Sequence, residues 1–375
     1  MAGIYIHVPF CKQACHYCDF HFSTNTRLKK TMLEAMEKEL ELRKDYLAHA
    51  PIQSIYFGGG TPSLLEAPLL ADLFQHISQH FVVQSGAEVT LEANPDDITL
   101  EKLKAWKSLG INRLSIGVQS FQAPVLRYLN RAHDSRQAVK SIELAQKAGF
   151  NDLSIDLIYA IPQSDDNRWE ADLTMALKLA PTHMAAYCLT IEKNTVFGRW
   201  QERGKLKAVS DEMAARQFEV LVETMAAHGY EHYEVSNFCL PGHYAVHNSN
   251  YWKQSSYLGI GPGAHSYDGV TRQFNVSNNP RYIDSLLQGT VPCTVERLSP
   301  QDHINEYIMT SLRTQWGCDL DRLKNEHGYD LEQAQSTYLQ RLLNQQLATR
   351  KGYRLLLTRQ GKLLADQIAT DLFVD

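Results

Sequence analysis

Short runs of apolar and β-branched residues alternate with longer amphipathic segments through most of the chain. This alternation is typical of βα units and predicts a largely parallel sheet with helices packed on it. The predicted strands are Ile4 to Val8, Ser54 to Phe57, Glu88 to Glu92, Arg113 to Val118, Leu153 to Ile158 and Met184 to Ile191. The predicted helices are Arg27 to Ala48, Pro68 to His80, Leu100 to Leu109, Ala123 to Leu129, Ser135 to Lys147, Trp169 to Leu179 and Ser210 to His228.

Turn residues punctuate this pattern. The segment Asn94 to Asp97 predicts a turn and N-cap before the third helix, and Gly110 and Gly149 lie just past predicted helix ends, where glycine is favoured. Six βα units suffice for an incomplete TIM-like (β/α)6 barrel, and an open doubly wound sheet is the main alternative. The predicted fold class is α/β, with the barrel as the preferred form.

Both architectures bind ligands at the carboxyl ends of their parallel strands. The chemically unusual residues of this chain fall at or near those ends. They are Cys11, the segment Gly58-Gly59-Gly60-Thr61-Pro62, Glu92, Gln119 and Asp156. This placement predicts one shared site at that end of the sheet.

The pattern changes between Val276 and Pro300, where asparagine, glycine and proline interrupt it. Beyond this point it becomes helical, and then two short strands around Lys351-Gly352 precede a last helix. We therefore expect a first domain over residues 1–290 and a small, mainly helical, winged-helix-like domain over residues 291–375. Packing against the barrel is the favoured role of the second domain, ahead of DNA recognition.

The composition is that of a soluble globular protein. The 375 residues are 44% hydrophobic and 21% charged, and the formal net charge is -5, so the whole chain has no electrostatic signature of nucleic-acid binding. No positively charged lead-in precedes the first apolar segment, and no apolar run approaches the roughly 18 residues of a membrane span. These features predict a cytoplasmic protein that does not bind nucleic acid.

Three cysteines lie close together directly after the first predicted strand. Cys11, Cys15 and Cys18 form a Cys-x3-Cys-x2-Cys run, which predicts a metal or iron–sulfur site with one coordination position left free. Zinc remains an alternative if His16 or His21 supplies a fourth ligand, and three unrelated buried thiols are a further one. A disulfide framework is disfavoured, because the seven cysteines are odd in number and the other four are scattered.

Two glycine-rich segments could approach a ligand closely, because glycine has no Cβ atom. The first, Gly58 to Pro62, lacks the lysine and the following serine or threonine that end a P-loop motif. By itself it is more typical of a tight turn. The second, Gly259 to Gly263, contains a proline that fits a dinucleotide-binding fingerprint poorly.

The order of several motifs adds a family resemblance. The motifs are YIHVPFCKQACHYCDF, FGGGTPS, LEANP, GVQSF, LNRAH, DLIYAIP and GIGPGAHSY. In this order they resemble the radical S-adenosylmethionine (SAM) proteins of the oxygen-independent coproporphyrinogen III oxidase group, over nearly the whole chain. The resemblance implies that Cys11, Cys15 and Cys18 hold three irons of a 4Fe-4S cluster, and that SAM chelates the fourth iron and receives an electron from the cluster.

The same resemblance implies the other cofactor-binding positions. Gly59, Gly60 and Thr61 match the loop that contacts the methionine part of SAM. The polar SAM-contacting positions are matched by Tyr5, Glu92, Gln119, Arg131 and Asp156. Without the motifs, Arg131 would be taken for a helix-end charge and Asp156 for a partner of nearby backbone.

Two departures separate the chain from the coproporphyrinogen oxidases of the group. Those enzymes have a fourth cysteine where Phe20 stands, which also belongs to the predicted cofactor-binding set, and they have an N-terminal extension before the first strand. The segment from His247 to Trp252 matches instead the His-Asn-x-x-Tyr-Trp signature of the heme chaperones of the group. Histidine is a common axial ligand of heme iron, and aromatic rings can contact a porphyrin.

The resemblance therefore implies a heme chaperone that binds heme, with His247 in its site, and passes it to apo-hemoproteins such as respiratory enzymes. Transient contact with a membrane surface and a homodimer are further expectations. The alternative function is that of an oxygen-independent coproporphyrinogen III oxidase, a radical SAM decarboxylase of heme biosynthesis.

Overall fold

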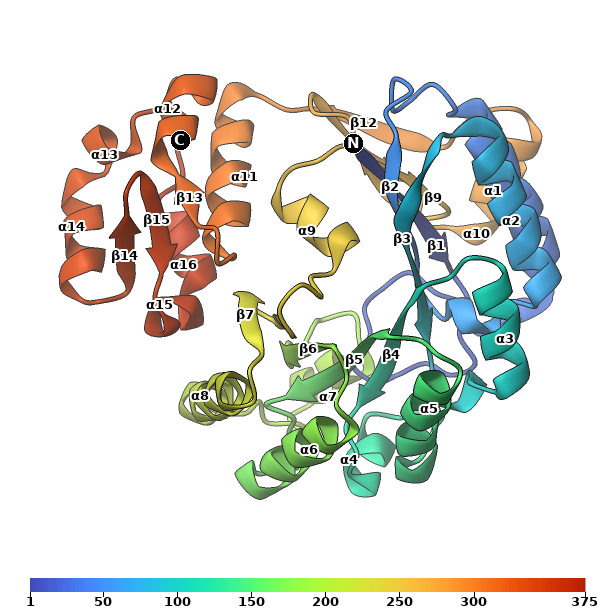
Figure 1. Cartoon of the computed structure of the whole chain (residues 1–375), viewed down its shortest axis with the longest axis horizontal. Coiled ribbons are helices and arrows are strands. Elements are labelled where there is room, and N and C mark those ends of the chain that lie inside the picture. The colour runs from blue at the N-terminus through green and yellow to red at the C-terminus, as the bar shows by residue number, and fades with distance from the viewer. Residues whose placement is uncertain (375) are drawn as a thin grey trace.

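The computed structural model describes residues 1–374 and contains a partial barrel and a smaller second unit (Figure 1). The barrel is built on six parallel strands that pair in chain order. They are β1 (Ala2–Val8), β2 (Ile52–Gly59), β3 (Val83–Ala93), β4 (Arg113–Gln119), β5 (Asp152–Tyr159) and β6 (His183–Cys188). The predicted α/β barrel is confirmed, although the sixth strand ends at Cys188 rather than at Ile191.

Helices between consecutive strands cover the outside of this sheet (Figure 1). They are α1 (Lys29–Leu42), α2 (Ala67–His80), α3 (Leu100–Ser108), α4 (Ala123–Tyr128), α5 (Ser135–Lys147) and α6 (Asp166–Leu179), with α7 (Val196–Glu202) and α8 (Asp211–Ala227) after β6. Local sequence sets their ends: Asp134 forms a capping box with Gln137 at the start of α5, and Gly110 and Gly149 follow helices with positive φ angles of 89° and 80°. The turn at Asn94 instead begins a short 3-10 helix, Pro95–Asp97, and Thr99 caps α3.

Strands from distant parts of the chain extend both edges of the sheet. On the β1 edge, β9 (Tyr257–Ile260) pairs in parallel, and β10 (His265–Tyr267), β11 (Thr271–Asn275) and β12 (Cys293–Arg297) follow antiparallel. On the β6 edge lie β8 (Asn237–Cys239) and β7 (Glu231–Glu234). The segment 276–300, expected only to interrupt the pattern, thus contains both β12 and α10 (Asn279–Leu287).

A short helix packs against strands β1 and β2. In α9 (Val246–Trp252), Glu88 of β3 accepts hydrogen bonds from the first two backbone amides, of Val246 at 2.8 Å and His247 at 2.9 Å. The His247 ring stacks on Tyr56 of β2 with a centroid distance of 5.1 Å. The barrel interior at this end is therefore occupied by aromatic side chains.

The C-terminal unit has its own apolar core, separate from that of the barrel. It contains α11 (Pro300–Leu312), α12 (Leu320–His327), α13 (Leu331–Ala334), α14 (Ser336–Asn344), α15 (Arg359–Leu363) and α16 (Ala365–Asp371), with a small antiparallel sheet of β13 (Cys318–Asp319), β14 (Ala348–Lys351) and β15 (Arg354–Leu357). The two strands predicted around Lys351-Gly352 are confirmed as β14 and β15.

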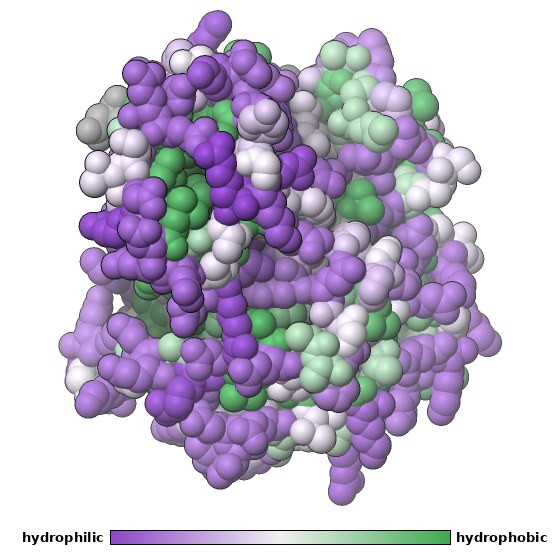
Figure 2. All heavy atoms as spheres, turned by 60° about the vertical axis from the view of Figure 1, so that its left-hand side comes forward, coloured by the Kyte–Doolittle hydropathy of each residue, from purple (hydrophilic) through white to green (hydrophobic). Residues whose placement is uncertain are grey.

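The second unit packs beside the β7 edge of the barrel (Figure 1). The Val235 amide donates to the Arg313 carbonyl at 3.0 Å, and the Arg313 guanidinium pairs with buried Glu234 at 3.2 Å. Over the described residues, no helix has the length and apolar character needed to cross a membrane. Figure 2 shows a mostly hydrophilic face on which hydrophobic residues form separate patches.

Candidate functional site

A cavity of about 520 Å³ lies at the carboxyl ends of the parallel strands. It brings together residues predicted from separate strands, loops and a helix end. The predicted residues that line it are Cys11, Cys15, Cys18, Phe20, Gly59, Gly60, Thr61, Glu92, Gln119, Arg131 and Asp156. The shared site expected from the strand-end pattern is therefore present as one cavity.

Polar contacts to the barrel hold the cysteine loop in place. Lys12 forms ion pairs with Asp96, at 2.7 Å, and with Asp97. The Asn130 side chain donates to the Ala14 carbonyl at 2.8 Å and accepts from the Gln13 amide at 2.7 Å. These contacts join the cysteine loop to the segment after β3 and to the segment after α4, so the barrel helps to position the loop.

The zinc alternative is not supported by the positions of the two histidines. The His16 ring lies outside the cavity lining, with its Nδ1 2.9 Å from the Tyr128 carbonyl and its ring against Trp200. His21 also lies outside it, and its Nε2 is 2.7 Å from Asn279 Oδ1. Neither imidazole can complete a tetrahedral set with the thiols in this arrangement.

Burial makes the ionised form of two of the thiols unfavourable. Burial raises the pKa of Cys11 to about 11 and that of Cys18 to about 12, so without a metal both are protonated at neutral pH. The hydrogen bond that Thr61 Oγ1 donates to Cys11 Sγ at 3.5 Å acts against this rise in the pKa of Cys11, and Arg131 Nη1 donates to Cys15 Sγ at 3.3 Å. In the part of the chain that is described, no three ligand side chains converge on one ion position. A four-iron cluster does not need such convergence, because each thiolate binds a different iron.

The glycine loop brings backbone close to the cavity. A Cβ atom at Gly60 would lie 2.7 Å from the carbonyl oxygens of both Val8 and Phe10, and Gly59 has a φ of +101°. The loop can therefore pass this close to β1 only with glycine at these positions.

Two half-buried carboxyl groups, those of Glu92 and Asp156, line the cavity. Burial raises the pKa of Glu92 to about 7 and that of Asp156 to about 6. Glu92 accepts from the Tyr56 hydroxyl at 2.8 Å, and Asp156 from the Ser115 hydroxyl at 3.1 Å, and no cation pairs with Glu92 among the described residues. Such groups suit a ligand that offers an ammonium group or ribose hydroxyls.

Arg131 and Gln119 complete the polar wall. Arg131 Nη2 donates to Asn94 Oδ1 at 2.7 Å and to the Gly117 carbonyl at 2.8 Å, while its buried Nε has no partner in residues 1–374. Gln119 has a φ of +65°, a strained backbone conformation for a residue with a side chain. The donor set, the close glycine loop and the unpaired Arg131 Nε together fit a 4Fe-4S cluster with SAM beside it.

Two predicted residues lie elsewhere. Tyr5 is half-buried, its hydroxyl is 3.2 Å from His7 Nδ1, and it lines a second cavity rather than this one. His247 is also outside it: its Nδ1 is 2.9 Å from Ser54 Oγ, and its Nε2 is 2.9 Å from the Tyr251 hydroxyl. Iron could bind His247 only after one of these two bonds broke, and the role predicted for this residue stays a prediction.

Some lining residues were not predicted from the sequence. Tyr187 and Cys188 are exposed at the end of β6, and Asn94 follows β3. Cys188 ends the sixth strand, much as Glu92 lies near the end of the third and Cys11 follows the first. The strand-end pattern is therefore the sequence signal that could have placed Cys188 in the cavity. Asn94 is predicted only as a turn residue, and nothing in the local pattern indicates its place in the cavity wall.

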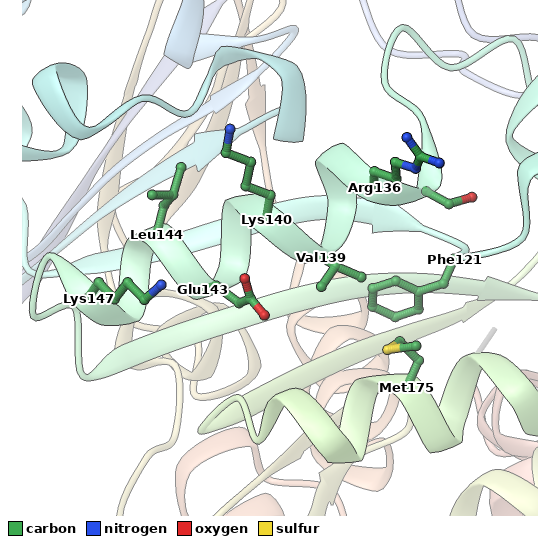
Figure 3. Close-up of a pocket in the computed structure, with 9 residues that line it drawn as sticks. Phe121, Arg136, Val139, Lys140, Glu143, Leu144, Lys147 and Met175 are labelled. Carbon is green, nitrogen blue, oxygen red and sulfur yellow. The ribbon is translucent and has the colours of Figure 1, made fainter.

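Further cavities lie outside this site, and two of them adjoin the barrel. One, of about 590 Å³, shares Asp19 and Phe20 with the first and reaches from the β9 to β11 edge to α11. The other lies between α5 and α6 (Figure 3), where Phe121, Val139 and Met175 point toward one another beneath basic side chains of α5. The α5–α6 groove contains none of the predicted site residues.

The partial barrel and its three-cysteine loop define a radical SAM protein. The family described as "Radical SAM superfamily" matches residues 5–176, and "HemN C-terminal domain" matches residues 298–364. The chain belongs to the HemW family, as the following relatives show.

A protein of Bacillus subtilis named "Heme chaperone HemW" is 34% identical over 98% of both chains. Its namesake in Mycobacterium tuberculosis is 36% identical over 99% of this chain and 94% of its own. Among solved structures, the coproporphyrinogen III oxidase HemN of Escherichia coli has a TM-score of 0.86 and 21% identity, covering 100% of this chain and 90% of that one. The HemN likeness establishes the fold alone.

Proposed function

We propose that this protein is a heme chaperone, which binds heme and transfers it to apo-hemoproteins such as respiratory enzymes. The observation that carries the proposal is the full-length similarity to proteins named heme chaperones, which extends across both the barrel and the C-terminal unit. Phe20, which stands where the coproporphyrinogen oxidases of the group have a further cysteine, supports a role other than that of the oxidase.

In this proposal Cys11, Cys15 and Cys18 hold three irons of a 4Fe-4S cluster. Arg131 donates to Cys15 and Thr61 to Cys11, and these hydrogen bonds orient two of the three side chains. The cluster, when bound, supplies an electron to SAM. The protein supplies the cavity that keeps both groups away from bulk water.

SAM binding is assigned to the walls of the same cavity. Backbone at Gly59 and Gly60 and the Thr61 hydroxyl would contact the methionine part. The Glu92 and Asp156 carboxyl groups would accept hydrogen bonds from the ammonium group or the ribose, and Gln119 and Arg131 would supply donors. Cytoplasmic location, membrane-surface contact and homodimer formation remain part of the proposal, and each can be measured on the purified protein or in cells.

The test uses anaerobically reconstituted protein in two reactions. In the first, protein loaded with heme is mixed with an apo-hemoprotein, and heme transfer is followed by the absorbance of the acceptor. In the second, SAM, a reductant and coproporphyrinogen III are supplied, and tetrapyrrole products are separated by chromatography. We expect stoichiometric heme transfer and no decarboxylated product. Catalytic turnover to protoporphyrinogen IX would instead establish the oxidase alternative.

A further inference from the structure

The second cavity has the construction of a binding site. It lies between the β9 to β11 edge of the barrel, with α9 beside it, and α11 of the C-terminal unit. Its volume of about 590 Å³ lies within the usual range of ligand pockets. The cysteines and the glycine loop do not line it, although Tyr5 and Phe20 of the predicted cofactor-binding set do.

Aromatic side chains form much of its wall. Tyr251 and Trp252 of α9, Tyr257 of β9 and Tyr267 of β10 all line the cavity. The rings of Tyr251 and Tyr257 meet edge to face at a centroid distance of 4.6 Å. Large flat side chains of this kind suit a planar apolar ligand.

The cavity also contains hydrogen-bond donors without acceptors. Trp252 Nε1 and Gln254 Nε2 are buried there and have no partner within residues 1–374. A buried donor left unpaired costs about 1–3 kcal/mol, which a ligand acceptor would recover. The Arg272 guanidinium lies in the same wall and pairs with Glu306 of α11 and, at 3.9 Å, with Glu296. A ligand carboxylate could therefore accept from Trp252 or Gln254 and share Arg272 with these glutamates.

One histidine of the cavity has free ring nitrogens. His7 is committed to the Tyr5 hydroxyl and the His21 carbonyl, and His21 Nε2 to Asn279. His265, at the start of β10, is solvent-exposed and lines the cavity, and neither of its ring nitrogens has a hydrogen-bond partner among the described residues. The Met309 thioether lines the same cavity from α11 and is 39% exposed.

We infer that this cavity holds heme, with His265 as the axial ligand of the iron and the porphyrin carboxylates near Arg272, Trp252 and Gln254. The inference rests on the proposed chaperone function, and it assigns iron ligation to His265 rather than to His247. The porphyrin faces contact the tyrosines of α9, β9 and β10. Heme bound here is open to solvent on the side of the exposed His265, which suits a ligand that is transferred to another protein.

The test is a heme titration of the full chain by absorbance and magnetic circular dichroism. His265→Ala should weaken heme binding by about tenfold or more and remove the signature of histidine ligation. His265→Cys should convert that signature to one of thiolate ligation, which a merely structural role would not produce. The exposed His228→Ala, at the end of α8, is the matched control and should bind as the parent does.

The outcomes separate the two proposals. If the parent binds heme and His265→Ala retains its affinity and spectrum, the ligand assignment is wrong while the chaperone function stands. The ligand assignment is also wrong if His247→Ala, folded by circular dichroism, loses the histidine signature and His265→Ala keeps it. If the parent binds no heme, both proposals fail.

Discussion

The guanidinium of Arg131 donates to the thiol of Cys15 across 3.3 Å, although 116 residues separate the two along the chain. The same group holds Asn94 and the Gly117 carbonyl, so one side chain joins the cysteine loop to the ends of β3 and β4. The barrel therefore helps to position the cysteine loop.

We therefore expect Arg131→Ala to lower both stability and cluster retention. Removal of the guanidinium leaves buried acceptors unpaired at about 1–3 kcal/mol each, and the loop loses a direct bond to Cys15. The free energy of unfolding and the iron content after anaerobic reconstitution are the measurements. Arg127→Ala, exposed on α4, is the control, and equal iron content in the two variants would contradict the expectation.

Gly60→Ala should disturb the first cavity more than Gly117→Ala. A methyl group at Gly60 meets backbone oxygens at 2.7 Å, which cannot move aside, whereas at Gly117 it meets the Gln119 side-chain amide at 3.0 Å, which can rotate. Neither glycine has a positive φ, so the comparison isolates the steric contact. SAM binding by isothermal titration is the measurement, and we expect a loss of about tenfold or more for Gly60→Ala alone. Similar SAM affinities would show that the loop does not need its close approach.

Glu39 should be critical for the edge that carries the second cavity. This fully buried carboxylate of α1 accepts from Arg43 at 3.2 Å, from Asn275 at 2.8 Å, from the Gly261 amide at 3.0 Å and from Tyr282. Glu39→Ala leaves Arg43 buried without its partner, which costs about 3–5 kcal/mol.

Chemical denaturation of Glu39→Ala beside Glu41→Ala tests this expectation. Glu41 lies on the same helix and forms only an exposed pair with Lys38, so its loss should change stability little, because solvent screens exposed ion pairs. An equally small effect at Glu39 would mean that the buried network contributes little net stability.

The apoprotein should lose stability steeply below pH 6.5. Burial lowers the pKa of His7 and His133 to about 4 and that of His232 and His247 to about 3. The unfolded chain binds protons at these histidines below pH 6.5 while the folded chain does not, so the unfolded state gains about 2 kcal/mol per histidine at pH 5. The raised pKa values of Glu92 and Asp156 offset part of this loss, because the folded chain binds protons at these carboxyl groups first.

Urea denaturation of the reduced apoprotein between pH 7.5 and pH 5 measures this loss. Replacement of exposed His228 should leave the slope unchanged, whereas His232→Gln should make it shallower. A free energy of unfolding that is flat over this range would show that the buried histidines are protonated in the folded state.

Much of the barrel could be predicted because each of its strands and helices is marked by a pattern of neighbouring residues. Each parallel strand is a short apolar run, and residues at strand ends must meet at one edge, which is why Cys11, Glu92 and Asp156 could be assigned to one site. The added strands could not be found in this way: β9 is only four residues long, and its pairing with β1 joins Tyr257 to Gly3 across most of the chain. The pattern of neighbouring residues contains no signal for such a partner.

The surroundings of individual side chains could not be predicted from the sequence either. The His-Asn-x-x-Tyr-Trp motif predicts that His247 and Trp252 act together, but they lie on a helix of seven residues that turns them to different surroundings. His247 enters the barrel interior against Tyr56, whereas Trp252 lines the second cavity. The residue at which α9 begins sets the direction of each side chain on the helix, and Glu88 fixes that start through its hydrogen bonds to the first two amides.

Phe20 forms part of the wall of both cavities and is 67% exposed, so little of its side chain is packed against the rest of the chain. A ligand that fixes this ring from one side changes the space available on the other. Thermodynamic linkage makes any such effect mutual: the factor by which SAM changes heme affinity is the factor by which heme changes SAM affinity. If SAM and heme bind where we propose, Phe20 would let the presence of SAM change how firmly heme is retained, with no SAM consumed.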